Sequence, residues 1–376
     1  MTEAVLFLLG TFAGVALLLH LASIALVARR IRTRDPAAGV QVPVTVLAPV
    51  CGVEPGIERT LASFFGLAGA DPQLLFCVAD GNDPVIPLVK GLIARHPDRD
   101  AALLVGEDRV SGNPKLNNLV KGWAAARGEF VVMTDSNQIL PPDYVAQLLG
   151  VCGEGVGLVS SPAVGIEPAG AWARIEAAFL NTHQARWQLA ADSVGLGFAQ
   201  GKTLAWPKAV LDRAGGPAAL GRDLAEDVAS TKVVRAAGLR VRLPRLPFAQ
   251  PLGRRSRATV WGRQLRWARI RRAGFPLIYG AEIASGGALP MLAVLALAAA
   301  GGVPPWLAVA FPLVWYAAEW ALARAAGWPS ALSDVAAMIA RDLLMPAIWI
   351  LGWRGGISWR GTEVTAAGTD AVGQTG

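Results

Sequence analysis

The feature that most constrains this chain is a run of apolar residues from Ala4 to Ala28, in which His20 is the only titratable side chain. Because a helix needs about 20 residues to cross the hydrocarbon core of a bilayer, the run predicts a transmembrane anchor over residues 1–30. Arginines follow the run, whereas a secretory signal peptide carries its positive charge before the apolar stretch. The mean hydropathy of +0.41, with 17% charged residues, also argues against an ordinary soluble enzyme of 376 residues.

A second apolar region, residues 276–355, predicts a C-terminal transmembrane region. Three segments fit within it, near 283–301, 303–323 and 335–353. Arg341 and Asp342 fall near the middle of the last segment, where charge is costly unless it is paired or faces a polar cavity. That segment therefore either spans the bilayer or lies in the interface. Because arginines flank the apolar regions, the positive-inside rule predicts an integral membrane protein with residues 29–275 in the cytoplasm.

Positive charge is concentrated in two short segments beside these apolar regions, although the net charge of the whole chain is only +7. The segments contain twelve arginines: Arg29, Arg30, Arg32, Arg34, Arg254, Arg255, Arg257, Arg263, Arg266, Arg269, Arg271 and Arg272. The rest of the chain is thus net acidic, which argues against a nucleic-acid-binding face. We interpret the second segment as an arginine-rich interfacial helix that ends a cytosolic domain.

Residues 40–275 contain no spanning run and alternate short apolar runs with helical stretches, which is typical of an α/β domain. Strands are expected at 44–48, 73–79, 101–105, 130–134 and 156–160. Helices are expected at 55–67, 84–95, 114–126, 141–151, 170–190 and 222–237. The strands are apolar throughout, so we expect a mostly parallel sheet that is covered on both faces. The tail, residues 362–376, is expected to be disordered.

Two expected strands end in a carboxylate, Asp80 after the second strand and Asp135 after the fourth. Ligands of such sheets bind at the carboxyl ends of the strands. A carboxylate there can hydrogen-bond the uracil or ribose of a nucleotide, or hold a divalent cation on a diphosphate. Either aspartate could instead cap a helix or make an Asx turn.

Two further groups are candidates. Residues 222–228 open an expected helix that includes Glu226, and Asp223 and Asp227 share one face of it. A carboxylate held near a helix start can take a proton from a substrate hydroxyl; acids in a first helical turn also simply complement the helix dipole. The second group is Gln264-Leu265-Arg266-Trp267, beside Arg263 in the arginine-rich segment. Its guanidinium groups suit bidentate phosphate binding, although the tryptophan and arginines could instead contact lipid headgroups.

In order along the chain, Asp80, Asp135, Glu226-Asp227 and Gln264-Leu265-Arg266-Trp267 resemble the "D, D, D, (R/Q)xxRW" signature of inverting glycosyltransferases with the A-type fold, a Rossmann-like mixed sheet. Closer details resemble the ceramide glucosyltransferases of glycosyltransferase family 21, and we expect a bacterial member. These details are Cys77-Val78-Ala79-Asp80, Asn113-Pro114-Lys115-Leu116-Asn117-Asn118-Leu119, Asp135-Ser136-Asn137, Ala214-Gly215-Gly216, Ala225-Glu226-Asp227 and Ile357-Ser358-Trp359-Arg360.

The resemblance implies a role for each matching residue. Asp80 would contact the uridine, and Asp135 would be the metal ligand that holds the metal–diphosphate. Asp227 would be the catalytic base. The remaining donor-binding residues would be Lys115, Asn137, Gln264, Arg266 and Trp267, and the acceptor side would include His183 and Glu226. Asn137 stands where the common Asp-x-Asp motif has its second aspartate, which weakens the expectation of a magnesium or manganese cofactor.

The expected reaction is transfer of glucose from UDP-glucose to the primary hydroxyl of ceramide, giving β-glucosylceramide at the inner (cytoplasmic) membrane of a bacterium. One alternative keeps this chemistry with another acceptor, such as a hopanoid or a glycolipid, or with a growing polysaccharide. The other alternative is a non-catalytic membrane scaffold. The sequence leaves the sugar and the acceptor open.

Overall fold

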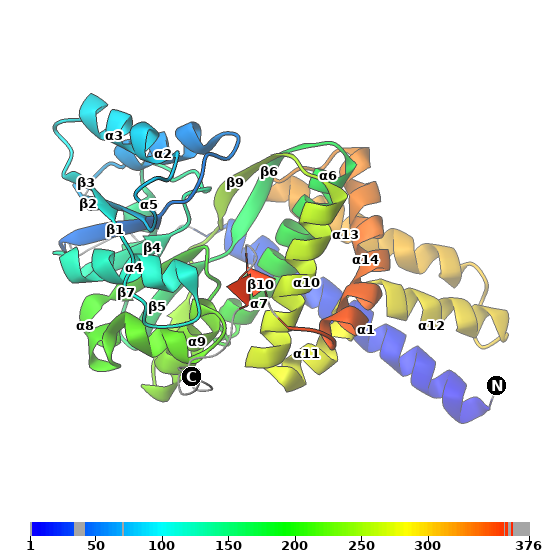
Figure 1. The fold of residues 1–376 in the computed structure, drawn as a ribbon. Helices are drawn as coiled ribbons and strands as arrows, with labels where there is room; N and C mark the ends of the chain where they lie inside the picture. The colour runs from blue at the N-terminus through cyan, green and yellow to red at the C-terminus, as the bar shows by residue number, and fades with distance from the viewer. Residues whose placement is uncertain (1, 34–41, 70, 357, 360–361, 364–376) are drawn as a thin grey trace, which may run out of the picture. The chain divides into compact units, whose positions relative to one another are not determined.

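The computed structural model describes residues 2–33, 42–69, 71–356, 358–359 and 362–363, which divide into two compact units (Figure 1). The helical unit holds the described residues of 1–33, 164–193 and 252–355, and the sheet unit holds those of 34–163, 194–251 and 356–376. This division differs from the expected single domain over 40–275. The tail expected to be disordered is residues 362–376, and 364–376 lie outside the described residues. Its first two residues form strand β11 (Thr362–Glu363), which pairs with β10 (Ser358–Trp359).

The sheet unit is built on a seven-stranded mixed sheet with the order β3-β2-β1-β4-β7-β5-β8 (Figure 1). Its strands are β1 (Val44–Pro49), β2 (Gln73–Val78), β3 (Ala101–Val105), β4 (Phe130–Thr134), β5 (Val156–Ser161), β7 (Thr203–Pro207) and β8 (Arg240–Arg242). The first five agree with the expected strands, and β7 and β8 are additional. Strand β7 runs antiparallel to both of its neighbours, β4 and β5, while the other neighbouring pairs are parallel.

Helices cover this sheet and bury its strands. They are α2 (Ile57–Phe65), α3 (Ile86–Arg95), α4 (Pro114–Ala125), α5 (Tyr144–Val151), α8 (Lys208–Arg213), the 3₁₀ segment η2 (Gly216–Arg222) and α9 (Glu226–Ala236). Every residue of β2 and β4 is buried, as expected for strands without polar alternation. Val46, Phe76, Val132 and Leu148 belong to the resulting core.

The strand order indicates where a ligand of this sheet would bind, at the carboxyl ends of the strands. From β1 the chain adds β2 and then β3 on one side, and β4 lies on the other side of β1. This reversal is a topological switch point, where loops after neighbouring strands diverge. Asp135 directly follows β4, so the fold places it at this point.

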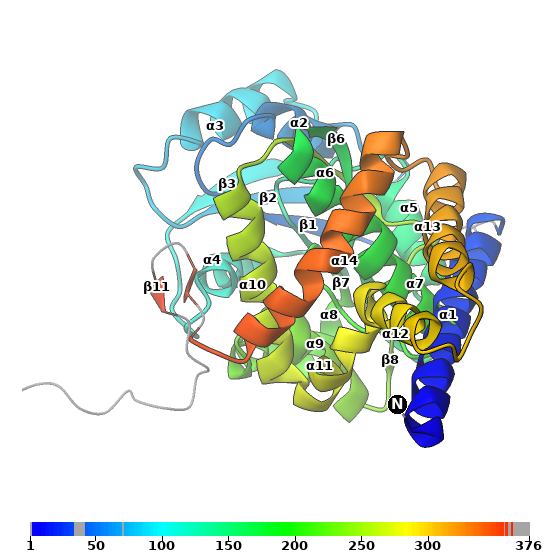
Figure 2. The same ribbon diagram turned by 90° about the vertical axis from the view of Figure 1, so that its right-hand side faces the viewer.

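The helical unit gathers segments that are far apart in the sequence (Figure 2). It contains α1 (Glu3–Ile31), α6 (Ala171–Ala178), the π-helix η1 (Phe179–Ala185), α7 (Arg186–Ser193), α10 (Arg257–Gly274), α11 (Pro276–Glu282), the 3₁₀ turn η3 (Ile283–Ser285), α12 (Ala288–Ala299), α13 (Leu307–Ala325) and α14 (Leu332–Gly352). Helix α1 packs against α7, α12 and α13, and α14 packs against α6 and α10. Strands β6 (Ala163–Ala169) and β9 (Phe248–Arg254) form a small sheet of their own, and the unit boundaries fall within them.

The single helix expected at 170–190 is three consecutive helical pieces, α6, η1 and α7. The middle piece has the wider turn of a π-helix, which the sequence pattern did not indicate. The guanidinium of Arg186, which is fully buried, donates to the backbone oxygen of Thr182 at 2.7 Å and stabilises this turn. Such π turns are frequent at functional sites.

Two of the described helices are long and apolar enough to cross a membrane, α1 and α14. The segment expected near 283–301 is part of a bent pair, Pro276–Ser285 with Ala288–Ala299, whose two halves meet at 50°. This pair is either a broken span or a re-entrant loop. Helix α13, expected as a span near 303–323, is not among these candidates. Its sequence contains Glu319 and Arg324, which lower its hydropathy.

Paired charges explain how α14 accommodates Arg341 and Asp342. Both side chains are 1% exposed, and the guanidinium of Arg341 lies 2.9 Å from a carboxylate oxygen of Asp342 and 3.0 Å from one of Glu319 on α13. Arg341 also donates to the hydroxyl of Thr182 at 2.7 Å. Because an intramembrane charge is tolerated when it is paired, the two charges do not prevent α14 from spanning.

Candidate functional site

Lys115 lies at the centre of a cluster of charged groups in the sheet unit. Its ammonium nitrogen is 2.7 Å from a carboxylate oxygen of Asp135 and 2.7 Å from one of Glu226, and it donates to the backbone oxygen of Gly201 at 2.6 Å. An ammonium group has three donors, so all three are engaged. Lys115 therefore organises the two carboxylates and contributes positive charge to the site, and offers no further donor to a ligand in this arrangement.

Strand pairing brings a second lysine to Asp135. In the antiparallel pair, Thr134 of β4 is opposite Thr203 of β7, so the residues just beyond them, Asp135 and Lys202, are neighbours. The ammonium nitrogen of Lys202 lies 3.0 Å from the other carboxylate oxygen of Asp135 and 3.1 Å from the side-chain oxygen of Asn137. Burial alone would raise the pKa of Asp135, but Lys115 and Lys202 outweigh it and lower the pKa to about 2. Asp135 is thus ionised at neutral pH.

Glu226 is fixed on both of its carboxylate oxygens. One oxygen forms an ion pair with Lys115, and the other accepts a hydrogen bond from the side-chain amide of Asn113 at 2.7 Å. Asn113 also caps α4 by accepting from the backbone N–H groups of Lys115 and Leu116. A Cβ atom on Gly201 would lie 2.9 Å from the Glu226 carboxylate. A larger residue at this position would push the Glu226 carboxylate away from Lys115 and Asn113, so glycine fits the loop before β7 to the cluster.

Asp227 stands beside Glu226 in the first turn of α9. Its carboxylate accepts hydrogen bonds from the backbone N–H of Gly201 at 3.0 Å and from its neighbour Val228 at 2.8 Å. Burial, followed by the negative charge of Glu226, raises the pKa of Asp227 to about 6. A carboxylate with a pKa this close to neutrality is suited to accept a proton as a general base.

Asp80 lies just beyond β2, exposed at the carboxyl edge of the sheet. Its carboxylate accepts a hydrogen bond from the backbone N–H of Asn82 at 2.9 Å, which is the Asx-turn geometry. The next acid, Asp83, accepts two hydrogen bonds from the backbone N–H of Gly52, at 2.9 and 3.0 Å, and ties this loop to the end of β1. A donor-binding role for Asp80 remains a prediction.

The expected cation site is at Asp135, among the residues that the structure describes. Among them, no group of three histidine, cysteine, aspartate or glutamate side chains is arranged to hold a metal ion. The oxygens of Asp135 and Asn137 are of the type that magnesium and manganese prefer, but two ammonium groups already contact them. The positive charge at Asp135 in this structure is therefore supplied by lysines.

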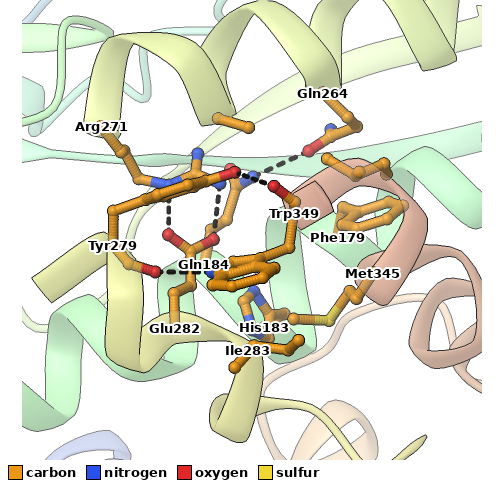
Figure 3. A pocket seen from close by; sticks show the side chains of 12 residues that line it. Phe179, His183, Gln184, Gln264, Arg271, Tyr279, Glu282, Ile283, Met345 and Trp349 are labelled. Carbon is orange, nitrogen blue, oxygen red and sulfur yellow. Dashed lines mark hydrogen bonds and ion pairs between the residues drawn. The ribbon is translucent and has the colours of Figure 1, made fainter. Parts of the chain in front are cut away.

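The remaining candidates, His183, Gln264, Arg266 and Trp267, belong to the helical unit. Trp267 packs against the cluster of Ala173, Ala177, Leu180 and Leu252. His183 and Gln264 line a pocket (Figure 3). That Gln264, Arg266 and Trp267 close on the diphosphate stays a prediction.

The spacing of the (R/Q)xxRW pattern requires a correction. Only Leu265 separates Gln264 from Arg266, so the residue three positions before Arg266 is Arg263. Arg263 forms an ion pair with Glu176 of α6, whose side chain is fully buried, and Arg255 lies 3.4 Å from the other oxygen of that carboxylate. Arg271 pairs with Glu282 at 2.6 Å. At least three arginines of the arginine-rich segment thus contact carboxylates of the protein.

The pocket is lined by α10, α11, η1 and α14. Nε2 of His183 and the hydroxyl of Ser285 form a hydrogen bond at 3.0 Å, in which either group can be the donor. Burial, with help from the positive charges of Arg341 and Arg186, holds the pKa of His183 well below its usual value, so the ring is neutral. Its other nitrogen, Nδ1, is buried and has no hydrogen-bond partner within the described part of the chain.

The sequence patterns missed Lys202 and Asn113 as members of the charged cluster. Arg263 was a candidate phosphate contact, but its place at the first position of the motif was missed. Lys202 could have been found only by predicting β7, since its place beside Asp135 follows from the β4–β7 register. Asn113 precedes Pro114, a typical helix start with an N-cap and a proline at the first position. Arg263 follows directly from counting the spacing of the motif.

One solved structure with a similar fold is a mannosyltransferase from Pyrobaculum calidifontis in complex with GDP-Man and Mn2+. It superposes with a TM-score of 0.57 and 20% sequence identity, over 94% of this chain and 98% of that one. At this identity the likeness establishes the fold, and it confirms the expected A-type glycosyltransferase fold.

Two curated relatives are ceramide glucosyltransferases. Ceramide glucosyltransferase 1 of Caenorhabditis elegans is 28% identical over 235 residues, which are 62% of this chain and 50% of that protein. A ceramide glucosyltransferase of Candida albicans is 38% identical over 106 residues, which are 25% of this chain and 20% of that protein. The chain thus spans about half the length of the Caenorhabditis relative. A family model described as "Glycosyl transferase family 21" matches residues 7–371, nearly the whole sequence, and the chain therefore belongs to this family.

Proposed function

We propose that this chain is a membrane-bound inverting glycosyltransferase that moves glucose from UDP-glucose to the primary hydroxyl of ceramide, giving β-glucosylceramide. Its family and its ceramide glucosyltransferase relatives support this reaction class and acceptor. The observation that carries the proposal is Asp227. Its carboxylate is held by two backbone N–H groups beside the Lys115 cluster, and its pKa is raised to about 6.

Asp227 is the proposed general base. Its carboxylate takes the proton from the acceptor hydroxyl as the hydroxyl oxygen attacks the anomeric carbon. A new carbon–oxygen bond forms on one face while the bond to the diphosphate breaks on the other, so the configuration inverts. A base whose pKa is about 6 is mostly deprotonated at neutral pH and retains more basicity than an ordinary aspartate.

The leaving diphosphate gains negative charge as this bond breaks, and positive groups fixed in advance stabilise that charge. Lys115 and Lys202 supply such charge at Asp135. We propose that Asp80 contacts the uridine, with Arg266 and Trp267 also on the donor side. A magnesium or manganese ion bound with the diphosphate would be held by Asp135 and would supply further positive charge.

The proposed acceptor is a two-chain lipid, which scarcely leaves a bilayer. Helices α1 and α14 are long and apolar enough to anchor the protein in one. The arginines that follow α1 favour the cytoplasmic side for the sheet unit by the positive-inside rule. We therefore propose an integral membrane enzyme that uses a cytosolic nucleotide sugar, at the cytoplasmic membrane of a bacterium.

The test is transfer by the full chain reconstituted in lipid vesicles that contain ceramide. UDP-glucose should be consumed, and the product should be a glucosylceramide whose anomeric proton shows the β configuration by NMR. Vesicles with a hopanoid in place of ceramide test the rival acceptor. Consumption of no UDP-sugar in any vesicle would favour the membrane scaffold and contradict the proposal.

A further inference from the structure

Two glutamines form a hydrogen-bonded pair at the pocket of the helical unit (Figure 3). The side-chain amide of Gln184, on η1, donates to the side-chain oxygen of Gln264, on α10, at 3.1 Å. Gln264 is 2% exposed. Its amide nitrogen and the side-chain oxygen of Gln184 are buried, and neither has a hydrogen-bond partner within the described ranges of the chain.

Buried polar atoms without a partner are uncommon and costly, so such a pair needs an explanation. The hydrogen bond between these two amides leaves the NH2 group of Gln264, a donor, and the carbonyl oxygen of Gln184, an acceptor, without partners among the described residues. If the nitrogen and oxygen atoms were exchanged in both side-chain amides, the unpaired donor would belong to Gln184 and the unpaired acceptor to Gln264. The pair would therefore still offer a donor and an acceptor. A secondary amide offers the matching set, since its carbonyl accepts and its N–H donates.

The surroundings of the pair favour a lipid as the source of this amide. The pocket wall includes Met345, Ile348 and Trp349 of α14, a helix that is long and apolar enough to span a membrane. Tyr279 of α11 forms another side of the pocket and is joined to Trp349 by two hydrogen bonds. The hydroxyl of Tyr279 donates to the backbone oxygen of Trp349 at 2.8 Å, and the indole N–H of Trp349 donates to the backbone oxygen of Tyr279 at 2.8 Å. An apolar chain can therefore lie along α14 while a polar head reaches the glutamines.

We propose that Gln184 and Gln264 recognise the secondary amide of an N-acylated lipid acceptor. The amide carbonyl accepts from Gln264, and the amide N–H donates to Gln184. This inference rests on the proposed function and deepens it, because ceramide has such an amide and hopanoids and diacylglycerols do not. It also assigns Gln264 to the acceptor and not to the diphosphate.

The cavity itself is narrow, with a volume of about 20 Å³, which is room for about one water molecule. Binding an amide therefore requires its wall to move outward. The wall segment α11–η3 is bounded by Phe275-Pro276 and by Gly286-Gly287, the break of the bent helix pair. The recognition pair lies on α10 and η1, outside that segment.

Binding of two matched lipids to the full chain in nanodiscs tests the proposal. One lipid is a fluorescent ceramide, and the other is its ester analogue, in which oxygen replaces the amide N–H. We expect the wild type to bind the ceramide about tenfold more tightly, since an unpaired buried acceptor is costly. Gln184→Met should weaken ceramide binding to the level of the ester and leave ester binding unchanged. Gln264→Met should weaken both lipids, because both retain the carbonyl.

Equal binding of the two lipids by the wild type, or an unchanged preference in Gln184→Met, would overturn the proposal. So would an equal loss for both lipids in Gln184→Met, which is the pattern of a purely structural defect. Glucose transfer is measured on the same samples. Amide preference without transfer would uphold the recognition pair and reject the proposed function, whereas transfer without amide preference would do the opposite.

Discussion

The ammonium nitrogen of Lys115 lies 2.7 Å from a carboxylate oxygen of Asp135, and the same nitrogen is 2.7 Å from a carboxylate oxygen of Glu226. One lysine at the start of α4 thus joins the end of β4 to the start of α9. The two acids were expected at these places, and the lysine explains how they are held together. Removing its charge should therefore affect both stability and turnover.

Lys115→Met should lower the unfolding temperature by several degrees and reduce turnover at least a hundredfold. The variant leaves Glu226, which is 6% exposed, without its counter-charge, and an uncompensated buried charge costs about 3–5 kcal/mol. Thermal unfolding of the purified protein measures the first effect. Lys208→Met is the control, because it removes a partly exposed pair with Asp212 and a cation–π contact with Trp123, each worth about 1 kcal/mol or less. Equal unfolding temperatures for both variants would contradict the role of Lys115.

The pH dependence of the reaction should report the pKa of Asp227. A base works when it is deprotonated, so kcat/KM should rise with pH through about 6 and reach a plateau above it. Part of the raised pKa comes from the negative charge of Glu226. Glu226→Gln should therefore shift the acid limb to lower pH.

Asp223→Asn is the control for this shift, because Asp223 pairs with Lys232 and is not among the groups that raise the pKa of Asp227. Its acid limb should coincide with that of the wild type. An unmoved limb in Glu226→Gln would show that Asp227 does not set the pH dependence.

Manganese binding should depend on the nucleotide. Lys115 and Lys202 contact both carboxylate oxygens of Asp135, so a divalent cation must compete with two ammonium groups for this ligand unless a diphosphate supplies further oxygen ligands. Electron paramagnetic resonance of Mn2+ should show weak binding to the ligand-free protein and at least tenfold tighter binding with UDP. Tight binding without UDP would mean that the protein alone holds the metal.

Arg341→Leu should destabilise the helical unit, because it removes the ion-pair partner of buried Asp342 and the nearer one of buried Glu319, whose second partner, Arg186, is 3.9 Å away. It also removes the hydrogen bond to the hydroxyl of Thr182 in the π-helix. Adding Asp342→Asn should restore part of the lost unfolding temperature, because it removes a buried charge whose ion-pair partner is gone. Arg324→Leu, at an exposed position on α13, should change it little. A double variant no more stable than Arg341→Leu would contradict the pairing.

The sequence indicated much of the sheet unit because its signals are local. The first five strands are short apolar runs, and Asp135 and Asp227 follow from where a strand ends and a helix begins. Lys202 was missed because its contact with Asp135 depends on antiparallel pairing between β4 and β7, which no local pattern encodes. The glutamine pair of η1 and α10 was missed for the same reason, since a π-helix and long-range packing bring it together.

The membrane region was only partly predictable. Hydropathy identified α1 and the region of α14, but the doubt over Arg341 and Asp342 could be resolved only by seeing Glu319 beside them. The bend between α11–η3 and α12 was also hidden, because the two halves read as a continuous apolar segment. Composition gives the length of an apolar segment, and packing decides whether it is straight.

The most direct test of the central claim compares Asp227→Asn with the wild type in ceramide-containing vesicles. The amide keeps the shape of the carboxylate and cannot accept the proton, so glucose transfer should fall at least a thousandfold, within the range for loss of a general base. UDP-glucose binding, measured by calorimetry, should change less than about threefold. Transfer by Asp227→Asn at the wild-type rate would contradict the account.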